Sequence, residues 1–273
     1  MKKILLIAVL IGAMFSVSAY VVCIAAPLLG KSIKGSGNIV SKNIEAPDFN
    51  AVDASRAVKV IISAEASDIR IEADDNLIDL VIAKAKGKTL EVTLDQKANN
   101  LQNASITVTV PANGGNIRSL KASSASKITS DVTLRADRFT IDASSAAKIK
   151  AAVEAASCSI DASSASKVSA EVKATTCTVD ASSASKIELE GSTESLSADL
   201  SSASKLDAAK LTAVNAAVSA SSASKAEIAC SGQLTAEASS GSSIRYTGDC
   251  RTSLSKSSGG SIRKNNTRST RQP

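Results

Sequence analysis

Histidine and tryptophan are absent from this 273-residue chain, and its only aromatic residues are three phenylalanines and two tyrosines. Without histidine, Ser-His-Asp and Cys-His catalytic sites are excluded. The five cysteines show no CxxC spacing, so a structural zinc site is not expected. The scarcity of aromatic rings removes the platforms on which carbohydrate-active enzymes stack sugar rings. The composition therefore predicts a non-enzymatic protein with no cofactor and no metal site.

An excess of one charge sign is also missing from the body of the chain. The formal net charge is +6, from 32 basic and 26 acidic residues. Six of the basic residues lie at the two ends of the chain: Lys2, Lys3, Arg263, Lys264, Arg268 and Arg271. The segment 4–262 then holds 26 basic and 26 acidic residues. This balance gives no excess of positive charge for nucleic acid, so we expect no nucleic-acid binding. We expect the polar, basic tail 263–273 to be disordered.

The N-terminus, MKKILLIAVLIGAMFSVSAYVVCIAAP, has the layout of a secretory signal peptide over residues 1–26. Two lysines precede an apolar run that ends in small residues, with cleavage expected after Ala19 or Ala26. Retention of residues 4–29 as a membrane anchor is the alternative, because the apolar run is long. Cleavage would leave no stable membrane insertion. It predicts an exported protein in the periplasm, on the outer membrane surface or secreted.

A five-residue phrase recurs through the second half of the chain. Its copies are SSASK or SSAAK, and two decayed copies follow; the first residues are Ser123, Ser144, Ser163, Ser182, Ser201, Ser221, Ser239 and Ser257. Successive spacings are 21, 19, 19, 19, 20, 18 and 18 residues. A fixed period near 19 residues is typical of a stacked repeat, and it fits one coil of a β-solenoid.

Apolar residues occupy fixed positions relative to this phrase. The position three residues before the first Ser holds Leu120, Ile141, Ile160, Val179, Ala198, Val218, Ala236 and Leu254. Five residues after the first Ser stand Ile128, Ile149, Val168, Ile187 and Leu206, and four further on Val132, Val153 and Val172. Alternation of these positions with polar ones indicates half-buried strands. The prediction is an all-β fold, a right-handed parallel β-helix with coils of about 19 residues over 119–262.

Residues 35–118 lack the repeat but are rich in strand patterns, such as AVKVIIS, TLEVTL and SITVTVP. The segment Asp53–Lys59, DASRAVK, looks like a degenerate copy of the phrase DASSASK. We therefore expect an irregular N-terminal part of the solenoid that caps its first end.

Several of these pieces together resemble a known family. GSGNIVSKNIEAPDFNAV, IRIEADDNLIDLV, TLEVTL and ITVTVP, followed by the Ser- and Ala-rich coils, resemble the GIN head domains of autotransporter adhesins over roughly Gly35 to Arg263. The resemblance implies a β-helical fold and export. It implies no binding residues, because the family has none that could be transferred to this chain.

Two charged columns are candidates for a binding surface. The last residue of each phrase gives a lysine column: Lys127, Lys148, Lys167, Lys186, Lys205 and Lys225. An outward lysine ladder could bind an anionic glycan, polysaccharide or lipid head group; the alternative is a solvated turn neutralised in part by an aspartate column. That aspartate column comprises Asp142, Asp161, Asp180 and Asp199. Calcium binding by these aspartates is not expected, because the coils lack Gly-rich loops.

Four cysteines lie outside the predicted signal peptide. Cys158 and Cys177 are 19 residues apart and fall in the same column, which in stacked strands separates their Cα atoms by about 4.8 Å, within disulfide range. Cys230 and Cys250 are 20 residues apart and are a second candidate pair. The alternative for both pairs is reduced thiols packed as small apolar groups.

The sequence thus predicts an exported, non-enzymatic, adhesin-like β-solenoid with an extended binding or structural surface in the bacterial cell envelope. A glycan, a polysaccharide or a host surface protein would be its partner, and the oligomeric state is not predicted. The alternatives are a β-helical carbohydrate-active enzyme, either a polysaccharide lyase or a glycosidase, and a periplasmic scaffold protein, since a fold does not define a function.

Overall fold

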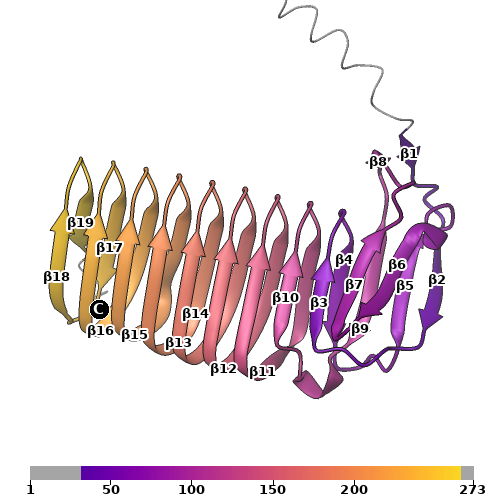
Figure 1. Cartoon of the computed structure of the whole chain (residues 1–273), viewed down its shortest axis with the longest axis horizontal. Helices are drawn as coiled ribbons and strands as arrows, with labels where there is room; N and C mark the ends of the chain where they lie inside the picture. The colour runs from indigo at the N-terminus through magenta and orange to yellow at the C-terminus, as the bar shows by residue number, and fades with distance from the viewer. Residues whose placement is uncertain (1–31, 266–273) are drawn as a thin grey trace, which may run out of the picture.

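Strands form nearly all the regular structure of residues 32–265, the part of the chain that the computed structural model describes (Figure 1). Within this range the helical turns are two 3-10 segments, η2 (Ile78–Leu80) and η3 (Asn113–Gly115). Among the same residues, no helix has the length and apolar character needed to cross a bilayer. The signal peptide predicted over 1–26 lies outside the described residues, as does 266–273 of the predicted tail.

The described residues contain nineteen strands, which form an irregular N-terminal part and a regular stack. The N-terminal strands are β1 (Ile33–Lys34), β2 (Ile39–Ile44), β3 (Ala51–Ala54), β4 (Lys59–Ser63), β5 (Ile69–Asp74), β6 (Val81–Lys86), β7 (Thr89–Leu94), β8 (Leu101–Gln102) and β9 (Ile106–Pro111). The stack contains β10 (Ser119–Ala122), β11 (Lys127–Ala143), β12 (Lys148–Ala162), β13 (Lys167–Ala181), β14 (Lys186–Leu200), β15 (Lys205–Ala220), β16 (Lys225–Ala238), β17 (Ser243–Thr247), β18 (Arg251–Lys256) and β19 (Ser261–Lys264).

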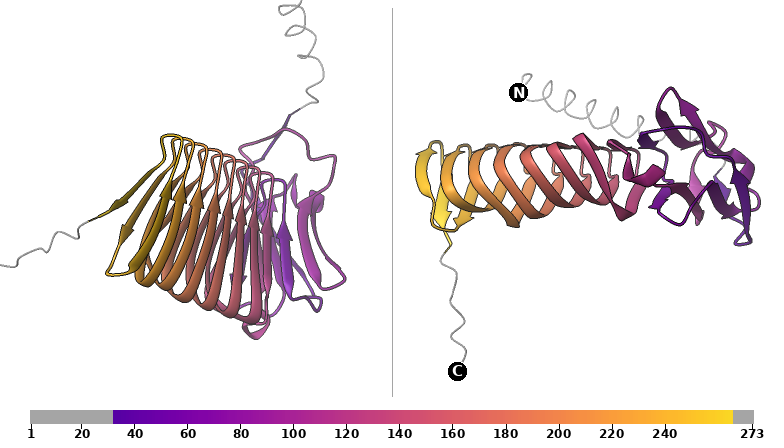
Figure 2. Two further views of the ribbon diagram at one scale, coloured as in Figure 1. Left: turned by 60° about the vertical axis from the view of Figure 1, so that its left-hand side comes forward. Right: turned by 90° about the horizontal axis from the view of Figure 1, so that it is seen from below.

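Each strand from β11 to β16 wraps around most of one coil and pairs in parallel with the next (Figures 1 and 2). In Figure 1 the chain rises along the front face, turns at the top and descends behind while it advances from β11 toward β19, which is a right-handed path. The prediction of a right-handed parallel β-solenoid is therefore confirmed. β19 includes Arg263 and Lys264, so the stack extends two residues beyond the predicted boundary at 262.

The inward columns form the core of the stack. Ile149, Val168 and Ile187 are Cα partners in successive coils, and each is at most 2% exposed. The column that begins at Leu120 is equally buried until its last member, Leu254, which is 40% exposed in β18. β18 pairs with β16, and no further strand among the described residues covers it on the other side.

The third inward column departs from its predicted membership. The register between β11 and β12 shifts between Thr129 and Thr133, so that Leu134 is the partner of Val153. Leu134 is fully buried, whereas Val132 is only partly buried. The first unit is 21 residues long, and a bulge accommodates its two extra residues. The assignment of Val132 to this column was wrong for that reason.

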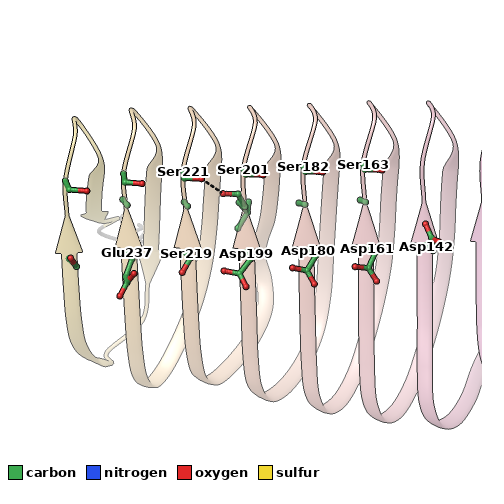
Figure 3. Close-up of a pocket in the computed structure, with 18 residues that line it drawn as sticks. Asp142, Asp161, Ser163, Asp180, Ser182, Asp199, Ser201, Ser219, Ser221 and Glu237 are labelled. Atoms are coloured by element: carbon green, nitrogen blue, oxygen red, sulfur yellow. Dashed lines mark hydrogen bonds between the residues drawn. The ribbon is translucent and has the colours of Figure 1, made fainter.

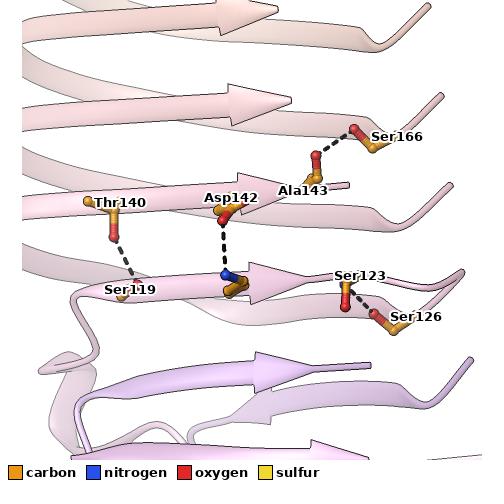
Figure 4. Close-up of polar contacts among 8 residues, drawn as sticks. Ser119, Ser123, Ser126, Thr140, Asp142, Ala143 and Ser166 are labelled. Carbon is orange, nitrogen blue, oxygen red and sulfur yellow. Dashed lines mark hydrogen bonds and ion pairs between the residues drawn. The ribbon is translucent and has the colours of Figure 1, made fainter. Parts of the chain in front are cut away.

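The SSASK phrase forms the tight turn between coils. At Ser123–Ser126 the amide of Ser126 donates to the Ser123 carbonyl (3.1 Å), and the central residues Ser124 and Ala125 have φ of 51° and 61°. Positive φ at both central positions is the feature of a type I′ turn, which normally takes Asn-Gly. The buried Ser126 hydroxyl donates to the carbonyl of Ala54 in the preceding coil (2.8 Å). Figure 4 shows the equivalent bond from Ser166 to Ala143.

Replacing Ala184 by Gly in one of these turns should stabilise the protein. Ala184 is exposed at φ 60°, and an L-residue in this region costs roughly 1–2 kcal/mol. Part of the gain is offset by the greater unfolded-state entropy of Gly, which leaves about 0.5–1 kcal/mol. The chain itself places Gly241 at the equivalent position, with no atom within 4 Å of an added Cβ.

Chemical denaturation of Ala184→Gly against the parent protein measures this gain. Ala181→Gly is the matched control in the same coil, since Ala181 is buried within β13, where Gly should lower the free energy of unfolding by about 0.5–1 kcal/mol. A loss of stability in Ala184→Gly would show that the turn carries no backbone strain.

The N-terminal part joins the stack through the coil formed by β3 and β4. β3 pairs in parallel with both β7 and β10, and β4 pairs with both β9 and β11. The phrase-like segment Asp53–Lys59 consequently lies in register with Lys121–Lys127. β2 and β6 add antiparallel pairings with β5 and β7, so the first end of the solenoid is covered by strands of a different direction (Figure 2).

Candidate functional site

The turns separate two outward faces of the stack, and each face carries one of the predicted charged columns. Residues before the turn present the aspartates, and residues after it present the lysines. Parallel register repeats every outward side chain once per coil, at about 4.8 Å. Side chains that are far apart in sequence therefore form continuous ladders along the axis.

A groove of about 690 Å³ runs along the face before the turn (Figure 3). Its walls repeat two kinds of side chain in each coil. The first kind is the ladder of Asp142, Asp161, Asp180, Asp199, Ser219, Glu237 and Ser255. The second kind is the first Ser of each phrase, which gives Ser163, Ser182, Ser201, Ser221, Ser239 and Ser257. We call this surface the acidic groove.

The carboxylates of the acidic groove interact with one another. Asp142, Asp161 and Asp180 are Cα partners in three successive coils. Partial burial, followed by the like charges of Asp180 and Asp142, raises the pKa of Asp161 above its ordinary value. The ladder ends at Lys121, whose ammonium lies 3.4 Å from Asp142. The groove therefore accumulates negative charge between its ends.

The six predicted lysines do form one ladder on the face after the turn. They are Cα partners from Lys127 to Lys225, and Lys59 extends the ladder by one coil toward the N-terminus. Lys127, Lys148 and Lys225 are exposed; the other three are half-buried. The ladder is thus continuous in position, but its charges are not equally available.

Glu188 neutralises the middle of the lysine ladder. Its carboxylate lies 2.9 Å from the Lys167 ammonium and 2.5 Å from that of Lys186. The aspartate column does not do so, because it lies on the opposite side of the turn, where Asp142 pairs with Lys121. The predicted source of neutralisation was therefore wrong, since the partner comes from the same face.

Glu188 should stabilise the protein above about pH 4.5 and lose this effect in acid. Hydrogen bonds from Lys186 and then Lys167 lower its pKa from 4.5 to about 2. Since the folded-state pKa is depressed, the stabilisation is present above the unfolded value and is lost as the pH falls toward 2. Solvent screening of this partly exposed cluster limits the contribution to about 1 kcal/mol.

Thermal melts of Glu188→Gln and the parent protein between pH 2 and 7 measure this contribution. The two melting temperatures should differ near neutral pH and converge near pH 2. Glu190→Gln, an exposed neighbour in β14, is the control that should show no such dependence. A constant difference at every pH would exclude the ion pairs as its cause.

Among residues 32–265 the four cysteines form no disulfide bond. Cys158 and Cys177 are Cα partners in β12 and β13, and both are buried. Cys230 is buried in β16, whereas Cys250 is only partly buried, just before β18. Bridging of the two pairs stays a prediction.

Within residues 32–265, no group of three His, Cys, Asp or Glu side chains is placed to hold a metal ion. The sequence pattern had identified both the aspartate column and the Ser column, but not that together they line one groove. The spacing of the phrases carried this signal, because equal spacing puts both columns into register.

Known proteins share this architecture. The family described as "Putative auto-transporter adhesin, head GIN domain" matches residues 48–250. A structure described as a "putative adhesin" from Parabacteroides merdae has a TM-score of 0.79 and 19% identity, and covers 87% of this chain and 100% of its own. A "putative adhesin" from Parabacteroides distasonis has a TM-score of 0.79 and 16% identity, over 86% and 100%.

A third structure, described as a "Putative lipid binding protein" from Parabacteroides distasonis, has a TM-score of 0.73 and 17% identity, over 86% of this chain and 100% of its own. At these identities, the three structures establish the fold alone. No curated protein matches the chain.

Proposed function

Since the chain belongs to the family described as "Putative auto-transporter adhesin, head GIN domain", we propose that it is an exported, non-enzymatic, adhesin-like rod whose acidic groove binds an extended glycan. Membership of this family supports the adhesin-like role. The groove, which runs along the stack and repeats the same side chains in successive coils, supplies the surface.

The repetition of the acidic groove is the observation that carries this proposal. From Asp142 to Glu237 six coils each contribute one acid or hydroxyl, so the ladder spans on the order of 25 Å. Carboxylates accept hydrogen bonds, while serine hydroxyls both donate and accept. These are the groups that bind sugar hydroxyls, and a periodic ladder suits a ligand that is itself a linear polymer. The negative charge favours neutral or amine-bearing polysaccharides over anionic ones.

Binding of three polysaccharides tests the proposal: one neutral, one amine-bearing and one anionic. Replacing Asp161, Asp180 and Asp199 together by Asn should weaken binding of the amine-bearing polymer by about tenfold or more, since several charge contacts are lost. The matched control replaces Lys127, Lys148 and Lys225 by Ser and should leave this binding unchanged.

If only the anionic polymer binds, and the lysine variant abolishes that binding, the lysine ladder is the functional surface and the acidic groove is not. The lysine ladder is the alternative binding surface because three of its members, Lys127, Lys148 and Lys225, are exposed.

A carbohydrate-active enzyme is the second candidate, because stacking brings acids together. Asp161 and its partners repeat at about 4.8 Å, close to the roughly 5–5.5 Å carboxyl separation of retaining glycosidases. The raised pKa of Asp161 would suit a general acid. No aromatic residue lines the groove, however, so it lacks a stacking platform. Release of reducing ends or unsaturated products that disappears in Asp161→Asn would establish this function in place of adhesion.

Protease shaving of intact cells, compared with cells whose outer membrane has been opened, tests the location. Cleavage on intact cells is the expected result for an adhesin. Protection until the membrane is opened would favour the periplasmic scaffold.

A further inference from the structure

The two cysteine pairs differ in their access to solvent. Cys158 and Cys177 are at most 1% exposed, inside the stack and between covered coils. Cys230 is 3% exposed, but its partner Cys250 is partly exposed in the terminal coil. Of the two pairs, only the second therefore includes a cysteine that is partly exposed to solvent.

A close approach of the backbone brings the second pair together. Gly248 has φ of +97°, and a Cβ at this position would lie 2.1 Å from the carbonyl oxygen of Cys230. The chain can cross so near to Cys230 only because residue 248 is Gly. It reaches Cys250 two residues later, and the Cys250 thiol is near enough to add to the rise in the pKa of Cys230.

Cys250 lines a surface hollow of about 640 Å³ at the end of the rod. Asn215 and Gln233 give this hollow amide groups, and Arg251 and Lys264 give it positive charge. Asp249 lies 3.0 Å from Lys264 and offsets one of these charges. The hollow therefore combines an accessible thiol, hydrogen-bonding groups and a net positive charge.

We propose that this hollow is a thiol–disulfide exchange site. A small anionic disulfide oxidises Cys230 and Cys250 there to a disulfide bond, which we call the clasp. Glutathione disulfide, which carries several carboxylates, is the representative reagent. The clasp joins β16 to the coil that carries β17 and β18. The Cys158–Cys177 pair is closed to the same reagent once the stack has formed.

The exchange balances in two steps. The Cys250 thiol loses its proton to solvent, and its sulfur attacks the reagent disulfide, which forms a mixed disulfide and releases one reagent thiolate. Cys230 then loses its proton and attacks the Cys250 sulfur, which closes the clasp and releases the second thiolate. Two protein thiols are oxidised, and one reagent disulfide is reduced to two thiols.

Burial explains why the reaction begins at Cys250. Desolvation is the first cause that raises the pKa of Cys230 to about 11, and the neighbouring Cys250 adds to it. The Cys230 sulfur lies 3.3 Å from the Val214 carbonyl oxygen and 3.2 Å from that of Gln233. Cys230 is therefore the resolving thiol rather than the attacking one.

The experiment treats the folded, reduced protein with glutathione disulfide and maps each cysteine by mass spectrometry after alkylation, Cys23 included. The expected product has the 230–250 bridge and retains free thiols at Cys158 and Cys177. Cys250→Ser should leave Cys230 unmodified, whereas Cys230→Ser should trap the mixed disulfide on Cys250. Circular dichroism confirms that each variant is folded.

Two results would overturn the proposal. One is a stable mixed disulfide on Cys250 of the parent protein with Cys230 still reduced, because the two sulfur atoms would then be out of reach. The other is oxidation of Cys158 and Cys177 at the same rate as the terminal pair, because access would then not distinguish the pairs.

The charge of the hollow is tested with cystamine, a cationic disulfide. Reaction with glutathione disulfide should be faster than with cystamine by about fivefold or more at low salt, and the ratio should fall at high salt. Arg251→Gln should reduce the ratio, whereas Arg245→Gln, which removes a charge paired with Glu227, should not. Equal rates for both reagents would show that the positive charge of the hollow plays no part in the reaction. These outcomes are independent of glycan binding.

Discussion

Replacing Val168 by Asp is expected to lower the free energy of unfolding by at least about 4 kcal/mol. Val168 is fully buried between Ile149 and Ile187, its Cα partners in the adjacent coils. The substitution removes buried apolar area and puts a carboxyl group into the hydrophobic core. Since each coil is buried only by its neighbours, the loss should spread along the stack.

Denaturant unfolding followed by circular dichroism measures this effect. Thr178→Asp is the control, because Thr178 is an exposed residue of the same strand, and it should change stability by less than about 0.5 kcal/mol. Equal effects of the two substitutions would mean that the inward and outward positions of β13 are misassigned.

Replacing Gly191 by Ala is expected to have the second largest effect, a loss of about 3 kcal/mol or more. Gly191 has φ of +112°, which L-residues rarely adopt, and an added Cβ would lie 2.2 Å from the carbonyl oxygen of Val172. The contacted atoms of Val172 belong to the backbone, so neither Val172 nor residue 191 can move aside without disturbing the pairing of β13 with β14.

Gly87→Ala is the matched control for Gly191→Ala. Gly87 also has a positive φ of +62°, but no atom lies within 4 Å of an added Cβ. Its substitution should cost only the backbone strain of about 1–2 kcal/mol. The difference between the two variants isolates the steric contact with Val172, and equal losses would show that φ alone determines the cost.

Local propensity would have misassigned part of the stack, but the repeat did not. The Ala-rich run within Lys205–Ala220 favours a helix when taken alone, yet it forms β15. Its residues must pair with β14 and β16 on either side, and this pairing outweighs the preference of alanine. The period of the phrase contained this information, because it counts residues per coil.

Features that depend on the path of the chain between repeats could not be predicted from the sequence. The bulge that replaces Val132 by Leu134 follows from where two extra residues are accommodated, and unit length does not specify this point. Similarly, nothing in the order of the strands indicated that β3 and β4 would lie between β7, β9 and the first regular coils.

The sequence by itself determined the solenoid, its coil length, most of its inward columns and the alignment of the lysines, of the aspartates and of Cys158 with Cys177. All of these depend on one period repeated in register. Only the tertiary structure decided that Glu188 neutralises the lysine ladder, that the aspartates and serines line one groove, and that Cys250 is accessible while Cys158 and Cys177 are not. The physical reason is that charge pairing, cavities and exposure depend on which side of a turn a side chain occupies and on what covers it. Sequence spacing aligns equivalent residues of successive coils, but it does not specify these contacts.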